Sequence, residues 1–201
     1  MATLLILVAY LVGSIPTGLL LARRAGIDPR RSGSGNVGAT NVARSAGVRI
    51  GLATLAGDAT KGALPVVTAR WLDLGESVAA SAGVAAVIGH VAPIGLRFRG
   101  GKGVATALGA LSVLAPGAAA ACVAVFAAVA WRHRLVSLAS ILAAITAPAV
   151  LLVTGAPTGT TAAMAVVAAL IVARHHENLR RLVAGTEPRL ALPKERAAPK
   201  P

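Results

Sequence analysis

The 201-residue sequence is poor in cysteine and in charge. Its one cysteine, Cys122, cannot form an internal disulfide, which excludes a disulfide scaffold. Charged residues make up 13% of the chain, about half the share of a typical soluble domain, which is about 25%. The seven acidic residues and four histidines form no cluster with the spacing of a metal site. We therefore expect no metal and no other cofactor.

Apolar residues are present in excess. The hydrophobic types make up 56% of the sequence, and a further 22 residues are glycine. This content excludes a disordered chain, and one domain of this length cannot hide so much apolar surface from water. The sequence therefore predicts an all-α, polytopic membrane protein. We expect a single domain over residues 1–187 and a basic, disordered tail over residues 188–201.

Apolar runs of membrane-spanning length recur along the chain. No basic residue precedes the first run and Arg23 and Arg24 follow it, which is the reverse of a secretory signal. The region 104–130 is ambiguous, because Pro116 and Gly117 interrupt it, and it forms either one broken span or a short hairpin. The expected spans cover about residues 3–22, 50–70, 77–96, 104–130, 135–153 and 160–173.

The distribution of positive charge favours the hairpin. With a hairpin, one side of the membrane holds six basic residues between 23 and 49, three between 97 and 102, two at 132 and 134, and seven in the tail. The opposite side holds only Arg70. The positive-inside rule then predicts seven transmembrane helices, with the N-terminus outside and the C-terminus in the cytoplasm. This topology explains the net charge of +13 without nucleic-acid binding.

The polar clusters fall on the predicted cytoplasmic face. The first is the glycine-rich loop 32–41 with the arginine that follows it. Exposed N–H groups in such a loop form anion-binding nests, and arginine binds phosphate with two parallel hydrogen bonds. The alternative is an ordinary flexible loop. The candidate ligands in this cluster are Ser34, Asn36, Thr40, Asn41 and Arg44.

A second cluster is the basic, glycine-rich loop 97–103. Gly100, Gly101, Lys102 and Gly103 stand directly before a predicted helix start, where an anion is favoured by the helix dipole. The loop lacks the spacing of a Walker A motif, so nucleotide hydrolysis is not predicted. The alternative is a basic turn that only sets the topology.

The third cluster is the segment 174–181. If it is helical, His175 and Asn178 lie on one face, and a histidine can act there as acid, base or oriented donor. The alternative is a helix extension with solvated charges. Within the predicted spans, Asp58 and Lys61 are three residues apart and are expected to pair, as a structural ion pair near the site.

Six segments follow one another along the chain. They are Gly13-Ser-Ile-Pro-Thr-Gly18, Gly33-Ser-Gly-Asn-Val-Gly-Ala-Thr-Asn41, Gly57-Asp-Ala-Thr-Lys-Gly62, Gly89-His90, Gly100-Gly-Lys-Gly-Val-Ala-Thr106 and His175-His-Glu-Asn-Leu-Arg-Arg-Leu182. In these segments the chain resembles the bacterial membrane acyl-phosphate:glycerol-3-phosphate acyltransferases. The resemblance extends over about residues 10–187, and each segment is weak alone but specific in this order and spacing.

The resemblance implies a seven-span enzyme of the cell inner membrane with its active site facing the cytoplasm. It implies transfer of a fatty acyl group from acyl phosphate to the sn-1 hydroxyl of glycerol 3-phosphate, which starts phospholipid synthesis. Membrane lipids and the enzyme that makes acyl phosphate are the further partners it implies. By position, the resemblance assigns Ser34, Arg44, Lys102, His175 and Asn178 to catalysis. It assigns Ser140 to substrate contact and Glu177 to a structural role.

The expected chemistry is direct transfer, since acyl phosphate is already activated and carries its own leaving group. Lys102 and Arg44 are expected to clamp phosphates, while His175 and Asn178 orient the glycerol hydroxyl or stabilise developing charge. The proton acceptor is either a substrate phosphate or His175. A covalent acyl group on Ser34 is the less favoured route, because no base is adjacent to it in sequence. The competing function is a small membrane anion transporter or channel.

Overall fold

The computed structural model describes residues 1–190, and in this range it contains α-helices and short 3-10 turns but no strand. The helices are α1 (Ala2–Gly13), α2 (Thr17–Arg24), α3 (Ala39–Ser45), α4 (Val48–Trp71), α5 (Glu76–Val91), α6 (Val104–Leu114), α7 (Pro116–His133), α8 (Val136–Val153), α9 (Thr158–Arg174) and α10 (His176–Val183). The 3-10 turns are η1 (Pro29–Arg31) and η2 (Ile94–Leu96). The expected all-α class is therefore confirmed, whereas residues 191–201 of the expected tail lie outside the described range.

Within residues 1–190, four helical stretches are long and apolar enough to cross a membrane, namely Ala2–Arg24, Glu76–Leu96, Pro116–His133 and Val136–Val153. A fifth is added if α9 and α10, which meet at a bend of 59°, are counted as one span. This criterion of length and hydropathy finds four or five spans where charge distribution predicts seven.

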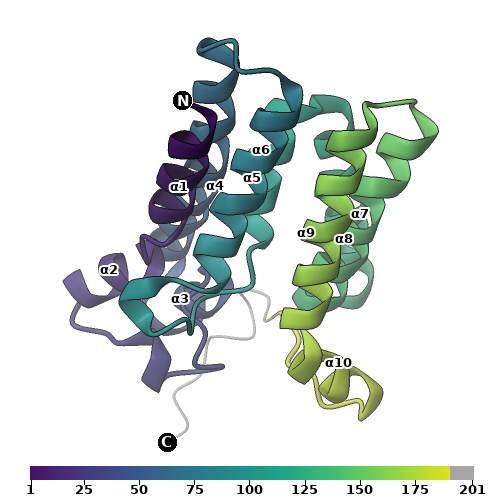
Figure 1. Ribbon diagram of the computed structural model, residues 1–201. Helices are drawn as coiled ribbons and strands as arrows, with labels where there is room; N and C mark the ends of the chain where they lie inside the picture. Colours follow the sequence, from purple (N-terminus) through teal and green to yellow (C-terminus); the bar gives the residue numbers. More distant parts are fainter. Residues whose placement is uncertain (191–201) are drawn as a thin grey trace, which may run out of the picture.

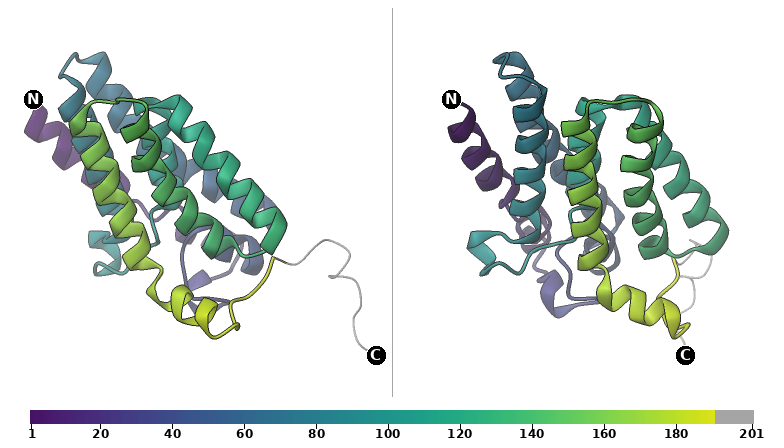
Figure 2. Two further views of the ribbon diagram at one scale, coloured as in Figure 1. Left: turned by 90° about the vertical axis from the view of Figure 1, so that its right-hand side faces the viewer. Right: turned by 45° about the vertical axis from the view of Figure 1, so that its right-hand side comes forward.

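Proline stands at two helix breaks, and the sequence analysis indicated the one at Pro116. Pro16 separates α1 from α2, because its ring cannot continue the helix. Pro116 is the first residue of α7, directly after Ala115, the non-helical residue that follows α6. Beyond this break α7 runs back along the bundle and packs on α8 (Figure 1 and Figure 2). The interruption expected within 104–130 is thus present.

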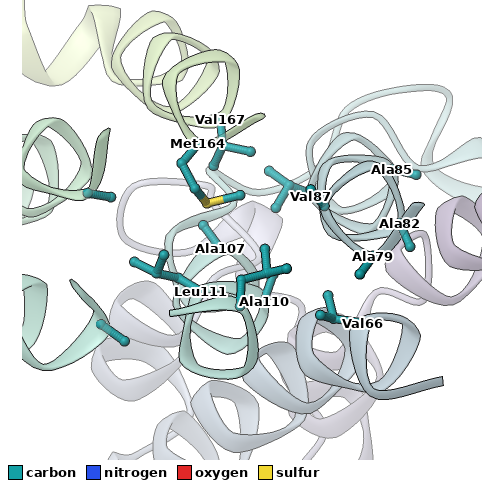
Figure 3. Packing of buried hydrophobic residues seen from close by; sticks show 14 of the residues in the cluster. Val66, Ala79, Ala82, Ala85, Val87, Ala107, Ala110, Leu111, Met164 and Val167 are labelled. Carbon is teal, nitrogen blue, oxygen red and sulfur yellow. The ribbon is translucent and has the colours of Figure 1, made fainter. Parts of the chain in front are cut away.

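Small side chains let the central helices pack closely. Val66 of α4, Ala79 of α5 and Ala110 and Leu111 of α6 belong to one buried cluster, and Met164 and Val167 of α9 complete it (Figure 3). Gly62 of α4 lies against the backbone of Thr106, and Gly109 of α6 lies against the backbone of Ala59. A Cβ at Gly62 would stand 1.9 Å from the Thr106 oxygen, so α4 and α6 are in backbone contact there.

One end of the bundle gathers the polar segments. In Figure 1, α2, α3, α10 and the connection between α5 and α6 all lie at the lower end, far from the turns that join α4 to α5 and α8 to α9. The three polar clusters identified in the sequence therefore share one end of the molecule, as expected.

Candidate active site

The second and third clusters meet in a direct side-chain contact. The Nζ atom of Lys102 donates a short hydrogen bond to Oδ1 of Asn178, which is 76 residues away in the chain. Lys102 comes from the loop before α6, and Asn178 comes from the buried face of α10. A second bond, from Arg174 Nη2 to the carbonyl of Gly100 at 3.3 Å, ties the end of α9 to the same loop. The structure thus joins two of the three predicted clusters.

The surroundings of Lys102 weaken its hold on its proton. Burial lowers the pKa of Lys102 from its ordinary value of 10.5 to about 8. The negative charges of Glu187 and Glu177 oppose this shift, while Arg181 and Arg174 add to it. Lys102 is therefore still an ammonium at neutral pH, but it is poorly solvated and gains from an anionic partner.

The glycines of the loop that carries Lys102 let this loop pack closely against the end of α5. The N–H groups of Gly100 and Gly101 donate to the carbonyls of Val91 and His90, at 3.0 and 3.1 Å. A Cβ at Gly101 would stand 2.1 Å from Nε2 of His90, so only glycine fits there. These two N–H groups are used within the protein. The anion donors at this loop are then the Lys102 ammonium and the N-terminus of α6, which has no side-chain cap.

A buried polar network of α4, α5 and α6 lies next to that loop, inside the bundle. Asp58 and Lys61 form an ion pair at 2.9 Å, as predicted, and Lys61 also donates to the carbonyl of Ile15 at the break between α1 and α2. The His90 ring lies 3.7 Å from Asp58 and 3.0 Å from the hydroxyl of Thr106. The network therefore links α4, α6 and the break between α1 and α2 to the imidazole of α5 against which Gly101 packs.

His175 occupies the joint between α9 and α10, and only 2% of its surface is exposed. Its Nδ1 atom lies 2.7 Å from the carbonyl oxygen of Ile171. Since a carbonyl only accepts hydrogen bonds, Nδ1 carries the hydrogen of the neutral ring. Nε2 is then the unprotonated nitrogen, which is the form of imidazole that can accept a proton from a hydroxyl.

An acidic residue that sequence reasoning missed completes this cluster. Nδ2 of Asn178 donates to Oε1 of Glu187 at 2.6 Å, and Nε of Arg181 donates to Oε2 at 2.8 Å. The side chain of Glu187 is 8% exposed. Glu177, for which the resemblance implied a structural role, is exposed on α10. A glycine after the third motif, Gly185, was the available signal that the chain turns back here.

The first cluster is organised by one buried amide. Asn41, 3% exposed, accepts from the N–H of Ser34 and donates to carbonyls of the loop, including that of Asn36 at 2.8 Å. This arrangement holds the glycine-rich loop in one shape. Its hydrogen bonds give Asn41 a loop-holding task, while the side chains of Ser34, Thr40 and Arg44 are exposed around it.

The remaining candidates, Ser34, Arg44 and Ser140, make no direct contact with Lys102 among the hydrogen bonds and ion pairs of the described residues. Within residues 1–190, no hydrogen bond or ion pair connects Ser34 or Arg44 to Lys102 or Asn178. Ser140 is buried in α8 and donates to the Val136 carbonyl of its own helix at 2.8 Å. The described part of the chain also has no group of three histidine, cysteine or acidic side chains that could hold a metal ion.

Comparison with known proteins gives a consistent picture. Residues 3–185 match the family model described as Glycerol-3-phosphate acyltransferase. A glycerol-3-phosphate acyltransferase of Geotalea daltonii is 50% identical over 183 residues, which are 91% of this chain and 94% of that protein. One from Syntrophotalea carbinolica is 47% identical over 188 residues, covering 92% and 96%.

A solved structure has the same fold. The crystal structure of PlsY, an integral membrane glycerol 3-phosphate acyltransferase, in its glycerol 3-phosphate form matches with a TM-score of 0.91. The two chains are 41% identical, and the match covers 94% of this chain and 96% of PlsY. The lysophosphatidic acid form of PlsY matches with a TM-score of 0.89 at 40% identity.

Proposed function

This chain belongs to the glycerol-3-phosphate acyltransferase family, and from this premise we propose how its own residues carry out the reaction. It is an integral membrane acyltransferase that transfers a fatty acyl group to glycerol 3-phosphate in phospholipid synthesis. The observation that carries the mechanism is the Lys102–Asn178 contact, which joins two distant motifs at one end of the bundle.

The acyl donor in our proposal is acyl phosphate. Its carbonyl carbon is attacked by the sn-1 oxygen of glycerol 3-phosphate, the bond from that carbon to the phosphate oxygen breaks, and inorganic phosphate leaves. The products are 1-acyl-glycerol 3-phosphate and phosphate, and no acyl-enzyme forms. Because both substrates carry phosphate, the site must offset their mutual repulsion, which fits the basic residues gathered at this end.

Each candidate side chain has a role in this step. Lys102, with the N-terminus of α6, binds a substrate phosphate, and Arg44 binds the other. His175 accepts the hydroxyl proton at Nε2, the nitrogen left unprotonated by the bond of Nδ1 to Ile171. Asn178 orients the glycerol, while Ser34 and Ser140 line the site. The loop glycines and Asn36, Thr40 and Asn41 shape its phosphate-binding walls.

The proposed topology keeps the site in the cytoplasm. Seven spans, with α6 and α7 as a short hairpin, leave α2, α3 and α10 on the side that receives nearly all lysines and arginines. Soluble glycerol 3-phosphate and the enzyme that makes acyl phosphate then approach from the same side. The anion-transporter alternative needs a charged path across the membrane, whereas Asp58 and Lys61 neutralise each other.

The proposal is tested with purified protein in detergent or lipid. We expect inorganic phosphate and lysophosphatidic acid to appear together from acyl phosphate, only when glycerol 3-phosphate is present, and no product from acyl-CoA. Lys102→Ala and His175→Ala should each lose about a hundredfold or more in kcat/KM. The matched controls are Arg99→Ala, which removes a basic side chain near Lys102, and His176→Ala, which removes the imidazole next to His175. Both positions are exposed, and both variants should retain activity.

Two outcomes contradict the proposal. Turnover of acyl-CoA at the rate of acyl phosphate removes the assigned donor. An acyl group trapped on Ser34 in the absence of glycerol 3-phosphate replaces direct transfer with a covalent intermediate.

A further inference from the structure

The position of Glu187 is fixed from both sides of its segment. After α10 the chain reverses through Gly185, where φ is +70°, and the Thr186 N–H donates to the Arg181 carbonyl at 2.8 Å. Beyond Glu187, the Leu190 N–H donates to the carbonyl of Arg134 at 2.7 Å. This return path carries the carboxylate back beneath α10, where it is largely shielded from water.

The hydrogen-bond types in this cluster allow one arrangement only. A carboxylate accepts and an ammonium donates, so the amide between Glu187 and Lys102 must turn its NH2 to the carboxylate and its oxygen to the ammonium. A flipped Asn178 would face Glu187 with an oxygen and Lys102 with an NH2 group. Both bonds would be lost in a buried place, where unpaired polar atoms are costly.

The charged groups around Lys102 also indicate Glu187 as the residue that matters most. Among the charged groups around Lys102, which are Glu187, Arg181, Glu177 and Arg174, the carboxylate of Glu187 has the largest effect on it. Burial opposes ionisation of Glu187, but the nearby Ser137 hydroxyl and the bonds from Arg181 and Asn178 keep its pKa below the ordinary value. Glu187 is therefore a carboxylate at neutral pH, and it favours the charged form of Lys102.

We propose that Glu187 is a positioning residue of the acyltransferase site, which fixes the orientation of the Asn178 amide and through it places the Lys102 ammonium for the substrate phosphate. This inference rests on the proposed phosphate-binding role of Lys102. Glu187 itself does not contact substrate in this account. The acidic positioning role thus belongs to the residue after the α10 turn and not to Glu177, which neighbours Asn178 in sequence.

The test compares Glu187→Gln with Glu177→Gln, because both variants remove one carboxylate charge and keep the side-chain size. We measure kcat and KM for glycerol 3-phosphate, with acyl phosphate as donor, from about pH 6 to pH 10. Glu187→Gln should raise KM for glycerol 3-phosphate and lower kcat/KM roughly tenfold. It should also move the alkaline fall of kcat/KM down by about one pH unit, since Lys102 loses a neighbouring negative charge. Glu177→Gln should change each value much less.

A structural role alone gives a different pattern. If the folded fraction of Glu187→Gln falls while the folded molecules keep the wild-type KM and alkaline limb, the inference is wrong. It is equally wrong if Glu187→Gln and Glu177→Gln behave alike. Glu187→Asp keeps the charge and should hold the alkaline limb near its wild-type pH, which gives a second reading if the glutamine variant folds poorly. Failure of the wild-type protein to acylate glycerol 3-phosphate would instead refute the proposed function.

Discussion

At the scale of single residues, the site depends on Lys102, a lysine whose lowered pKa lets it lose its proton more readily than an ordinary lysine does. The sequence indicated Lys102 as a phosphate ligand from its place in a glycine loop, and it indicated Asn178 from its spacing to His175. It gave no sign that the two side chains touch, because that contact depends on the 59° bend between α9 and α10. Glu187 was missed because it is the turn at Gly185, after α10, that brings its carboxylate back to Asn178.

The lowered pKa of Lys102 gives a prediction for pH dependence. The substrate-binding form is the ammonium, which is complete well below the pKa of about 8 and is lost as the pH rises through it. We therefore expect kcat/KM for glycerol 3-phosphate to fall above about pH 8. Lys102→Arg keeps the charge at all these pH values, so its lower activity should show no such fall. An identical alkaline limb in Lys102→Arg would assign the limb to another group.

The contact of Gly101 with His90 predicts a loss of activity from a single methyl group. In Gly101→Ala the new Cβ meets Nε2 of His90, so the loop that carries Lys102 must shift. A displacement of about 1 Å in a catalytic group costs about a hundredfold in rate, which an assay of phosphate release would detect. Gly95→Ala is the control, because nothing lies within 4 Å of its Cβ. Equal activity of the two variants would contradict the tight fit.

At the scale of helices, the sequence predicted the breaks better than the boundaries. Pro116 marked a helix start correctly, whereas Pro65 and Pro148 lie inside α4 and α8. The separate helices α3 and α10 were less visible. Each is short, and its packing depends on the ends of other helices. The Asp58–Lys61 pair was predictable, because three residues within one helix fix the distance.

The buried pair gives a prediction for stability. Asp58→Asn removes the charge that compensates Lys61, and both side chains are almost fully buried. Leaving one buried charge unpaired costs about 3–5 kcal/mol, which should appear as a clearly lower Tm in detergent. Asp73→Asn is the matched control, since Asp73 is exposed with φ at +51°, a conformation that asparagine tolerates. A Tm for Asp58→Asn equal to that of the control would show that the pair adds no stability.

At the scale of the whole molecule, composition alone predicted the membrane class, and the charge count predicted a polar end. The structure gathers the three polar clusters at that end, although the criterion of length and hydropathy finds four or five spans in residues 1–190. The difference arises because α4 carries Asp58 and Lys61 and α6 has only 11 residues. Neither helix looks like a long apolar segment, yet both pack in the centre of the bundle.

The proposed topology predicts which positions are accessible in intact cells. In a Cys122→Ala background, a cysteine at Arg31 should react with a membrane-impermeant maleimide only after lysis. A cysteine at Thr158, the first residue of α9 next to the α8–α9 turn, should react before lysis. Both positions are exposed, so a reversed pattern would place the active site outside the cytoplasm.

The most direct test of the central claim is a double-mutant cycle on Lys102 and Asn178. We compare Lys102→Ala, Asn178→Ala and the double variant by kcat/KM for glycerol 3-phosphate. If the two motifs form one phosphate site through their hydrogen bond, kcat/KM of the double variant should be about equal to that of the less active single variant. If the two losses multiply, Lys102 and Asn178 act independently, and the account of a single joined site is wrong.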